Sequence, residues 1–167
     1  MTEPAKPAVE RIHPPAVVIR MGNPLLAWLL AGSRRASAVG RSLLLLHVTG
    51  RRSGRVYSTP VGYHRQPDGS LLVLTSSTWR VNFRGGPTPV ALTLLGRRVA
   101  ATAVLQEDPD LVAKEYQRLI AEFGLARATR RLGIRVNVDR EPTLQELADV
   151  ARREHLSTVN LQLSETG

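Results

Sequence analysis

Short apolar segments, each closed by a turn rich in Gly, Pro or Asp, follow one another through the middle of this 167-residue chain. The first segment, residues 42–48, is apolar almost throughout and stops at a glycine-containing turn, as expected of a strand buried on both faces. The sequence Gln66-Pro67-Asp68-Gly69-Ser70 lies between two later segments and is a strong hairpin signal. Short strands joined by tight turns favour a barrel-like antiparallel sheet. The predicted strands are residues 42–48, 57–65, 71–76, 89–95 and 98–105.

Capping signals predict three helices around this series of strands. One helix begins where Asp108 precedes Pro109, and it stops at Gly124. Another begins with Thr143 and Glu146, which have the spacing of a capping box. The order of elements predicts an α+β fold built on a sheet of antiparallel strands with flanking helices. The predicted helices are Asn23 to Ser33, Asp108 to Phe123 and Thr143 to His155, and a last strand follows at Thr158 to Leu163.

The composition is that of one domain with an appended arm. Residues 1–20 form a polar, proline-rich stretch that we expect to be a flexible arm, and residues 21–167 are expected to form a single domain. Hydrophobic residues make up 43% of the chain but aromatics only 4%, so the core must be aliphatic. The chain has no cysteine and only four scattered histidines, so we expect no metal site. The lack of a secretory signal predicts a cytoplasmic protein.

The charge balance points to an anionic ligand. The chain carries 23 Lys and Arg against 14 Asp and Glu, and only Lys6 and Lys114 are lysines. The planar arginine fork suits phosphate and carboxylate groups. A basic surface also suits nucleic acid, but the basic residues lack interleaved aromatics and no helix-turn-helix is present, so we expect no nucleic-acid partner.

An apolar segment near the N-terminus has two interpretations. Residues 24–35 contain Trp28 among leucines and end in Arg34 and Arg35. In the first interpretation the segment is a helix packed across the mouth of the barrel. In the second it makes a peripheral membrane contact, with Trp28 at headgroup depth and the arginines on anionic lipid. The second interpretation would make the cytoplasmic protein membrane-associated.

The sequence Thr49-Gly50-Arg51-Arg52-Ser53-Gly54-Arg55 carries the strongest chemical signal. Its central residues 50–54, called here the GRRSG corner, place two glycines around paired arginines directly after a buried strand. Glycines permit positive φ, so successive backbone N–H groups can converge on an anion, and the arginines add charge-assisted contacts. The pattern is neither a Walker loop nor a Rossmann fingerprint. The alternative interpretation is a tight hairpin turn whose arginines face water.

Three segments in order, LLLLHVTGRRSGRVYSTPVGY, LLVLTSS and WRVNFRGG, resemble the deazaflavin (F420)-dependent nitroreductase family of the split β-barrel oxidoreductases. The resemblance covers residues 43–104 and implies a split β-barrel with coenzyme F420, its tail on the GRRSG corner and its ring in the barrel groove. Ser77 stands where the family often has lysine, and Arg84-Gly85-Gly86-Pro87 stands where Asn-Pro is common, which suggests a different subgroup. The implied coenzyme-binding residues are Thr49, Gly50, Arg51, Arg52, Ser53, Gly54, Thr59, Pro60, Thr75, Ser76, Ser77, Trp79 and Asn82.

The resemblance implies a reductase that transfers a hydride from the reduced deazaflavin to a small electrophilic acceptor: an activated alkene, a quinone or a nitro compound. Tyr57 and Tyr63 are candidates for a catalytic proton donor or for the wall of the ring pocket, and core packing explains them equally well. One alternative is an FMN-dependent reductase on the same fold. Another is a non-catalytic carrier of a fatty acid, haem or the coenzyme. The sequence leaves monomer and homodimer open.

Overall fold

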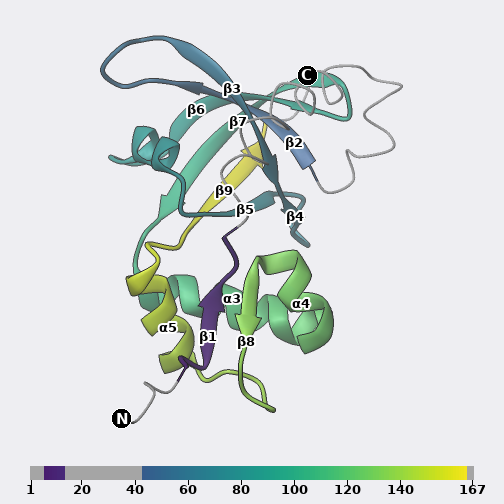
Figure 1. Cartoon of the computed structure of the whole chain (residues 1–167). Coiled ribbons are helices and arrows are strands. Elements are labelled where there is room, and N and C mark those ends of the chain that lie inside the picture. The colour runs from purple at the N-terminus through teal and green to yellow at the C-terminus, as the bar shows by residue number, and fades with distance from the viewer. Residues whose placement is uncertain (1–5, 14–42, 165–167) are drawn as a thin grey trace. The chain divides into compact units, whose positions relative to one another are not determined.

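The computed structural model describes residues 6–13 and 43–164, which fall into two compact units (Figure 1). The strand unit contains residues 43–105 and 158–164, and the helical unit contains residues 6–13 and 106–157. The elements of the strand unit are β2 Leu43–Thr49, β3 Val56–Gly62, β4 His64–Arg65, β5 Leu71–Thr75, η1 Thr78–Phe83, β6 Thr88–Leu94, β7 Arg97–Gln106 and β9 Ser157–Leu163. Those of the helical unit are β1 Val9–Arg11, α3 Pro109–Phe123, α4 Leu125–Leu132, β8 Ile134–Val136 and α5 Leu144–Arg153.

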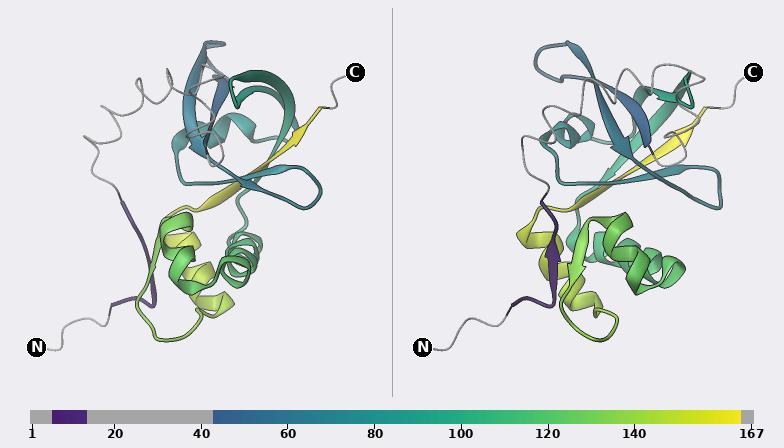
Figure 2. Two further views of the ribbon diagram at one scale, coloured as in Figure 1. Left: turned by 90° about the vertical axis from the view of Figure 1, so that its right-hand side faces the viewer. Right: turned by 45° about the vertical axis from the view of Figure 1, so that its right-hand side comes forward.

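The strand unit is a curled antiparallel sheet with the order β3-β2-β6-β7-β9-β5-β4 (Figure 2). Strand β2 pairs with β3 along its whole length, from Leu43 opposite Gly62 to Thr49 opposite Val56. Strands β3 and β4 occupy the two edges of the sheet although only Tyr63 separates them in the chain. The chain therefore crosses from one edge to the other, and the sheet curls into a half-barrel. This confirms the predicted α+β class with a split-barrel sheet.

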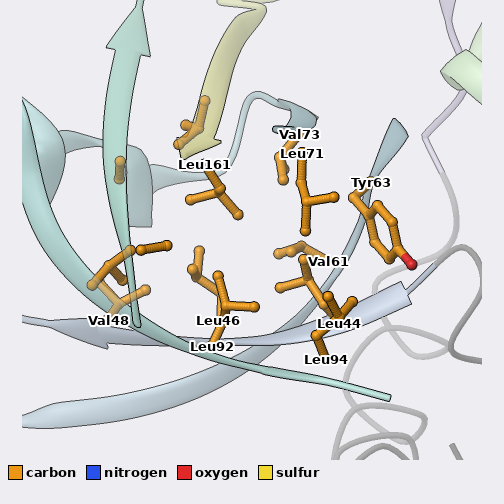
Figure 3. Close-up of a cluster of buried hydrophobic side chains, with 14 of the residues drawn as sticks. Leu44, Leu46, Val48, Val61, Tyr63, Leu71, Val73, Leu92, Leu94 and Leu161 are labelled. Carbon is orange, nitrogen blue, oxygen red and sulfur yellow. The ribbon is translucent and has the colours of Figure 1, made fainter. Parts of the chain in front are cut away.

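The core of the strand unit is aliphatic, as the composition requires. Leu44, Leu46 and Val48 alternate along one face of β2 and are buried there. They lie beside Leu92 of the neighbouring strand β6 and point toward Leu161 of β9 across the curled sheet (Figure 3). Each such side chain contributes about 1.5–3 kcal/mol by leaving water. This packing holds β2 in place, and the GRRSG corner continues directly from the end of that strand.

The helical unit packs α3 and α5 together with the two-stranded β1–β8 pair. Asp108 caps α3 by accepting hydrogen bonds from the backbone N–H groups of Asp110 and Leu111. Thr143 and Glu146 form the complete capping box of α5. Both caps satisfy backbone donors that a helix leaves unpaired at its start, and both confirm the helix starts that the sequence predicts.

The predicted elements that fall within the described ranges are all present, with one strand broken. The segment predicted as a single strand over 57–65 is interrupted at Tyr63, where the chain changes edge. The sequence did not predict β1, η1, α4 or β8, and β1 lies inside the stretch expected to be a flexible arm. The predicted helix at 23–33 and the membrane contact at 24–35 lie outside the described residues. The division into an arm over 1–20 and a domain over 21–167 stays a prediction.

Candidate functional site

The GRRSG corner is a compact turn that favours glycine at its two ends. The Gly50 N–H donates to the Arg55 carbonyl at 2.9 Å, and the Gly54 N–H donates to the Gly50 carbonyl at 2.8 Å. A Cβ at Gly50 would come within 2.6 Å of the Ser53 Oγ. Gly54 has φ +65°, in the left-handed region that other residues avoid. The turn therefore has a closely hydrogen-bonded backbone, and both of its arginines are exposed.

The short helix η1 fastens this corner from a distant part of the sequence. The Asn82 Oδ1 accepts a hydrogen bond from the Arg51 backbone N–H at 3.0 Å. The Arg51 guanidinium reaches the Val81 carbonyl at 3.4 Å. The chain thus brings together two of the segments that the family resemblance rests on, about thirty residues apart, and it does so through backbone groups as well as side chains.

A cavity of about 810 Å³ lies between the corner and η1. Several predicted coenzyme-binding residues meet at this cavity, as does Tyr57, one of the two catalytic candidates. The lining consists of Gly50, Arg51, Arg52, Ser53, Tyr57, Val81, Asn82 and Arg84. Cavities of this size accommodate small-molecule ligands and cofactors.

The stretch of chain that lines the cavity is rich in positive charge. Between residues 43 and 105 the only carboxylate is Asp68, in the hairpin turn between β4 and β5, where it accepts hydrogen bonds from Ser70. Those hydrogen bonds lower the pKa of Asp68, so it stays ionised and tied to its own turn. The eight arginines of the same stretch are Arg51, Arg52, Arg55, Arg65, Arg80, Arg84, Arg97 and Arg98. An anionic ligand is the natural complement of such a site.

The strand residues predicted to flank the coenzyme ring are not among the described residues that line this cavity. Thr59 and Pro60 pair with Leu46 and Leu45 in mid-strand, and because they are adjacent in β3 they point to opposite faces of the sheet. Their assignment to the ring stays a prediction.

The residues that follow β5 mainly build the turn into η1. The Thr75 Oγ1 accepts a hydrogen bond from the Ser77 N–H at 3.0 Å, and the carbonyls of Ser76 and Ser77 accept from Arg80. The Trp79 ring packs edge-on against Phe83, with centroids 5.9 Å apart, and contacts the core. These contacts support the cavity wall at Asn82, while a direct role at the ring stays a prediction for Thr75, Ser76, Ser77 and Trp79.

The two candidate tyrosines have different surroundings. Tyr57 is 42% exposed and lines the cavity, where its hydroxyl oxygen accepts a hydrogen bond from the Asn82 Nδ2 at 3.2 Å. Partial burial raises the pKa of Tyr57, and the Asn82 hydrogen bond opposes that rise. Tyr63 is buried in the core cluster, at the other end of the drawn side chains from Val48 (Figure 3). Tyr63 follows Gly62, which pairs with Leu43 at the start of β2. That end of β2 lies about 20 Å from the corner, so core packing explains Tyr63.

Two lining residues were not assigned to the site from sequence. Val81 and Arg84 line the cavity, and both lie in the WRVNFRGG segment on which the family resemblance rests. Arg84 follows η1 directly, where its backbone N–H donates to the Val81 carbonyl at 3.3 Å. The high number of arginines in residues 43–105 was the available signal for Arg84. Which of those arginines reach the corner depends on the path of η1.

His47 is a structural residue of the sheet. Its Nδ1 hydrogen-bonds the Ser58 hydroxyl at 2.7 Å and its Nε2 hydrogen-bonds the Thr93 hydroxyl at 2.8 Å, across three strands. Burial, aided by the charge of Arg98, lowers the pKa of His47. Within residues 6–13 and 43–164, no three His, Asp or Glu side chains gather as a metal site would require.

Comparison with known proteins gives one informative match. Residues 31–140 match the model of the F420H(2)-dependent quinone reductase family, and this range includes the GRRSG corner, Tyr57 and all of η1. No curated protein matches the chain. A solved structure described as a domain-swapped dimer aligns over its full length with 89% of this chain, at 14% identity and a TM-score of 0.44. This similarity is too low to support a conclusion about fold or function. No helix in the described part of the chain is long and apolar enough to cross a membrane.

Proposed function

The chain belongs to the F420H(2)-dependent quinone reductase family, and we propose that its cavity holds the anionic tail of the coenzyme. The reduced coenzyme would then pass a hydride to a quinone. Family membership makes the protein a deazaflavin-dependent oxidoreductase whose coenzyme is F420. Of the three acceptor classes expected from sequence, the family description favours quinones. Nitro compounds and activated alkenes are further acceptors to be compared with quinones in the same assay.

One observation carries the proposal: a cavity lined by Arg51, Arg52 and Arg84, in a stretch of chain whose single carboxylate is committed to another turn. Phosphate and carboxylate groups of a coenzyme tail would supply the missing negative charge. Arginine can meet such groups with two parallel hydrogen bonds, which are stronger than neutral ones. A fatty-acid or haem carrier fits less well, because three of the described lining residues, Arg51, Arg52 and Arg84, are arginines, while most of the surface of such a ligand is apolar.

The chemistry of hydride transfer belongs to the bound coenzyme, and the protein contributes binding, orientation and electrostatics. In this proposal Arg51 and Arg52 bind the tail, and Gly50 keeps the corner free of a Cβ. Asn82 ties the corner to η1 through the Arg51 backbone, so the corner is positioned before the ligand arrives. A pre-ordered site loses less conformational entropy on binding.

A binding titration tests the proposal. Purified protein is titrated with F420 by fluorescence, and with FMN in parallel. We expect F420 to bind and the double variant Arg51→Ala/Arg52→Ala to weaken it about 100-fold or more, because two hydrogen bonds from charged groups are lost. Arg118→Ala is the matched control, since that arginine is paired with Glu115 and Glu122 in the helical unit.

Two results would overturn the proposal. The first is a wild-type protein that does not bind F420. The second is a double variant that binds it as tightly as the wild type and the control do. Once binding is established, oxidation of reduced F420 with a quinone, a nitro compound and an activated alkene in turn measures the preferred acceptor.

A further inference from the structure

The side-chain amide of Asn82 joins three segments around the cavity. Its Oδ1 accepts the backbone N–H of Arg51 at 3.0 Å. Its Nδ2 donates to the Trp79 carbonyl at 2.9 Å and to the Tyr57 hydroxyl oxygen at 3.2 Å. Arg51, Tyr57 and Asn82 all line the cavity. One amide therefore sets the relative positions of the GRRSG corner, strand β3 and helix η1.

The hydrogen-bond partners fix the orientation of this amide. A backbone N–H can only donate, so the atom facing Arg51 must be the amide oxygen. A backbone carbonyl can only accept, so the atom facing Trp79 must be the amide nitrogen. The same nitrogen then supplies its second hydrogen to Tyr57. A flipped amide would place two donors against each other at Arg51 and two acceptors at Trp79, and it is excluded on both sides.

The orientation of the amide determines what the Tyr57 hydroxyl can do. Because the phenol oxygen accepts from Asn82, the phenol's own proton takes no part in that bond. No residue in the described ranges accepts that proton, and the side chain is 42% exposed where it lines the cavity. The raised pKa of Tyr57 keeps the hydroxyl protonated at neutral pH. The proton is therefore available to a ligand.

We propose that Tyr57 donates a hydrogen bond to an anionic oxygen of the ligand in this cavity, and that Asn82 is the positioning residue that directs its proton there. The proposal rests on the proposed function, since the ligand is the coenzyme tail. It assigns Tyr57 to binding rather than to proton transfer onto the acceptor. It also gives the site a neutral donor beside its arginines, and it makes Asn82 act through the tyrosine.

The experiment measures F420 affinity by fluorescence titration for wild type, Tyr57→Phe, Asn82→Asp and the double variant. Tyr57→Phe removes only the hydroxyl and should weaken binding about tenfold or more, as expected for one hydrogen bond to a charged group. Aspartate at position 82 still accepts from Arg51, but it accepts from Tyr57 as well and turns that proton away from the cavity. Its added charge and the loss of the hydrogen bond to the Trp79 carbonyl weaken binding in either background.

The double variant separates these two effects. If Asn82 acts through Tyr57, the Asn82→Asp penalty is smaller in the Tyr57→Phe background by about the factor that Tyr57→Phe itself costs, because no proton remains to be turned. Equal penalties in both backgrounds would overturn the positioning role. Tyr63→Phe makes the same chemical change in the core and should leave affinity unchanged, and thermal unfolding checks that every variant is folded.

A second probe identifies the group that Tyr57 meets. Inorganic pyrophosphate competes for the anion site, and Tyr57→Phe should weaken this competition by a factor similar to that for F420. If F420 binding weakens and pyrophosphate competition does not, Tyr57 does not meet an anionic oxygen and the proposal fails. If Arg51→Ala/Arg52→Ala weakens F420 binding and Tyr57→Phe leaves it intact, this proposal fails alone. If wild type binds no F420, the proposed function fails with it.

Discussion

The arginines of the two units differ in what neutralises them. In the helical unit, Arg118, Arg140 and Arg152 each form ion pairs with carboxylates, at nitrogen–oxygen distances of 2.7–3.1 Å. In the strand unit, Arg51 and Arg52 contact no carboxylate among the described residues, and both line the cavity. One residue type thus serves two purposes. The paired arginines support local structure, while in our proposal Arg51 and Arg52 keep their charge for the coenzyme.

The distribution of acids produces this difference. Glu115, Glu122, Asp110, Asp149 and Glu146 belong to α3 and α5, close to the arginines that they pair with. Exposed ion pairs of this kind contribute about 0–1 kcal/mol each, so the acids of the helical unit add little stability one by one. Residues 43–105 contain no acid apart from Asp68, and this matters more, because the positive charge of the corner is not neutralised within that stretch. We expect changes in the core of the helical unit to affect stability, and changes at the corner to affect binding.

The largest expected effect is a loss of stability in the helical unit without a loss of F420 affinity. Tyr116 is 3% exposed within α3, and burial raises its pKa to about 12. Tyr116→Ala should lower the free energy of unfolding by about 3–5 kcal/mol, because it leaves a large cavity. Denaturant titration measures this loss, and F420 affinity measured under folding conditions should stay within about threefold of wild type. A greater loss of affinity in the folded variant would break the distinction between the units.

The dependence of F420 affinity on ionic strength tests the charge of the corner arginines. The corner arginines are exposed and unpaired, so salt should screen their attraction for an anionic ligand. Raising sodium chloride from about 0.05 to 0.5 M should weaken F420 affinity about tenfold in wild type, and much less in Arg51→Ala/Arg52→Ala. The measurement is the same fluorescence titration at a series of salt concentrations. Parallel salt slopes for the two proteins would show that the corner does not attract the ligand by charge.

The smallest effect concerns an exposed ion pair. Glu146 accepts hydrogen bonds from Arg140 and from the Thr143 N–H, and with Arg140 as the main cause these lower its pKa from 4.5 to about 2. A lowered folded-state pKa stabilises the protein above pH 4.5, and the stabilisation is lost as pH falls from 4.5 toward 2. Glu146→Gln should therefore lower the Tm at neutral pH.

Thermal unfolding at a series of pH values checks this expectation. The difference in Tm between wild type and Glu146→Gln should be constant above about pH 5 and should narrow toward pH 2. A difference that persists unchanged at pH 2 would show that the carboxylate's charge is not its cause. F420 affinity at neutral pH should be equal in the two proteins, since Glu146 is not among the described residues that line the cavity.

Local signals in the sequence predicted most elements of the fold. The turn at residues 66–70, the cap at Asp108 and the capping box at Thr143 each depend on neighbours a few residues away, so they can be recognised without tertiary structure. Helix α4 was missed because its N-cap is Gly124, which has no side chain to give a capping signal. Strands β1 and β8 were missed because they pair with each other across more than a hundred residues, and three residues carry too little pattern to be recognised.

An anionic ligand could be predicted from residue types at fixed spacing: glycines that permit the corner, arginines inside it and few acids nearby. The family was predicted from three segments that follow one another in the chain. Which side chains surround the cavity could be read only from the folded chain. Asn82, Val81 and Arg84 reach the corner because η1 folds back on a turn about thirty residues earlier, and Tyr63 is withdrawn because the chain changes edge there. Contacts between distant segments depend on packing, which no local pattern encodes.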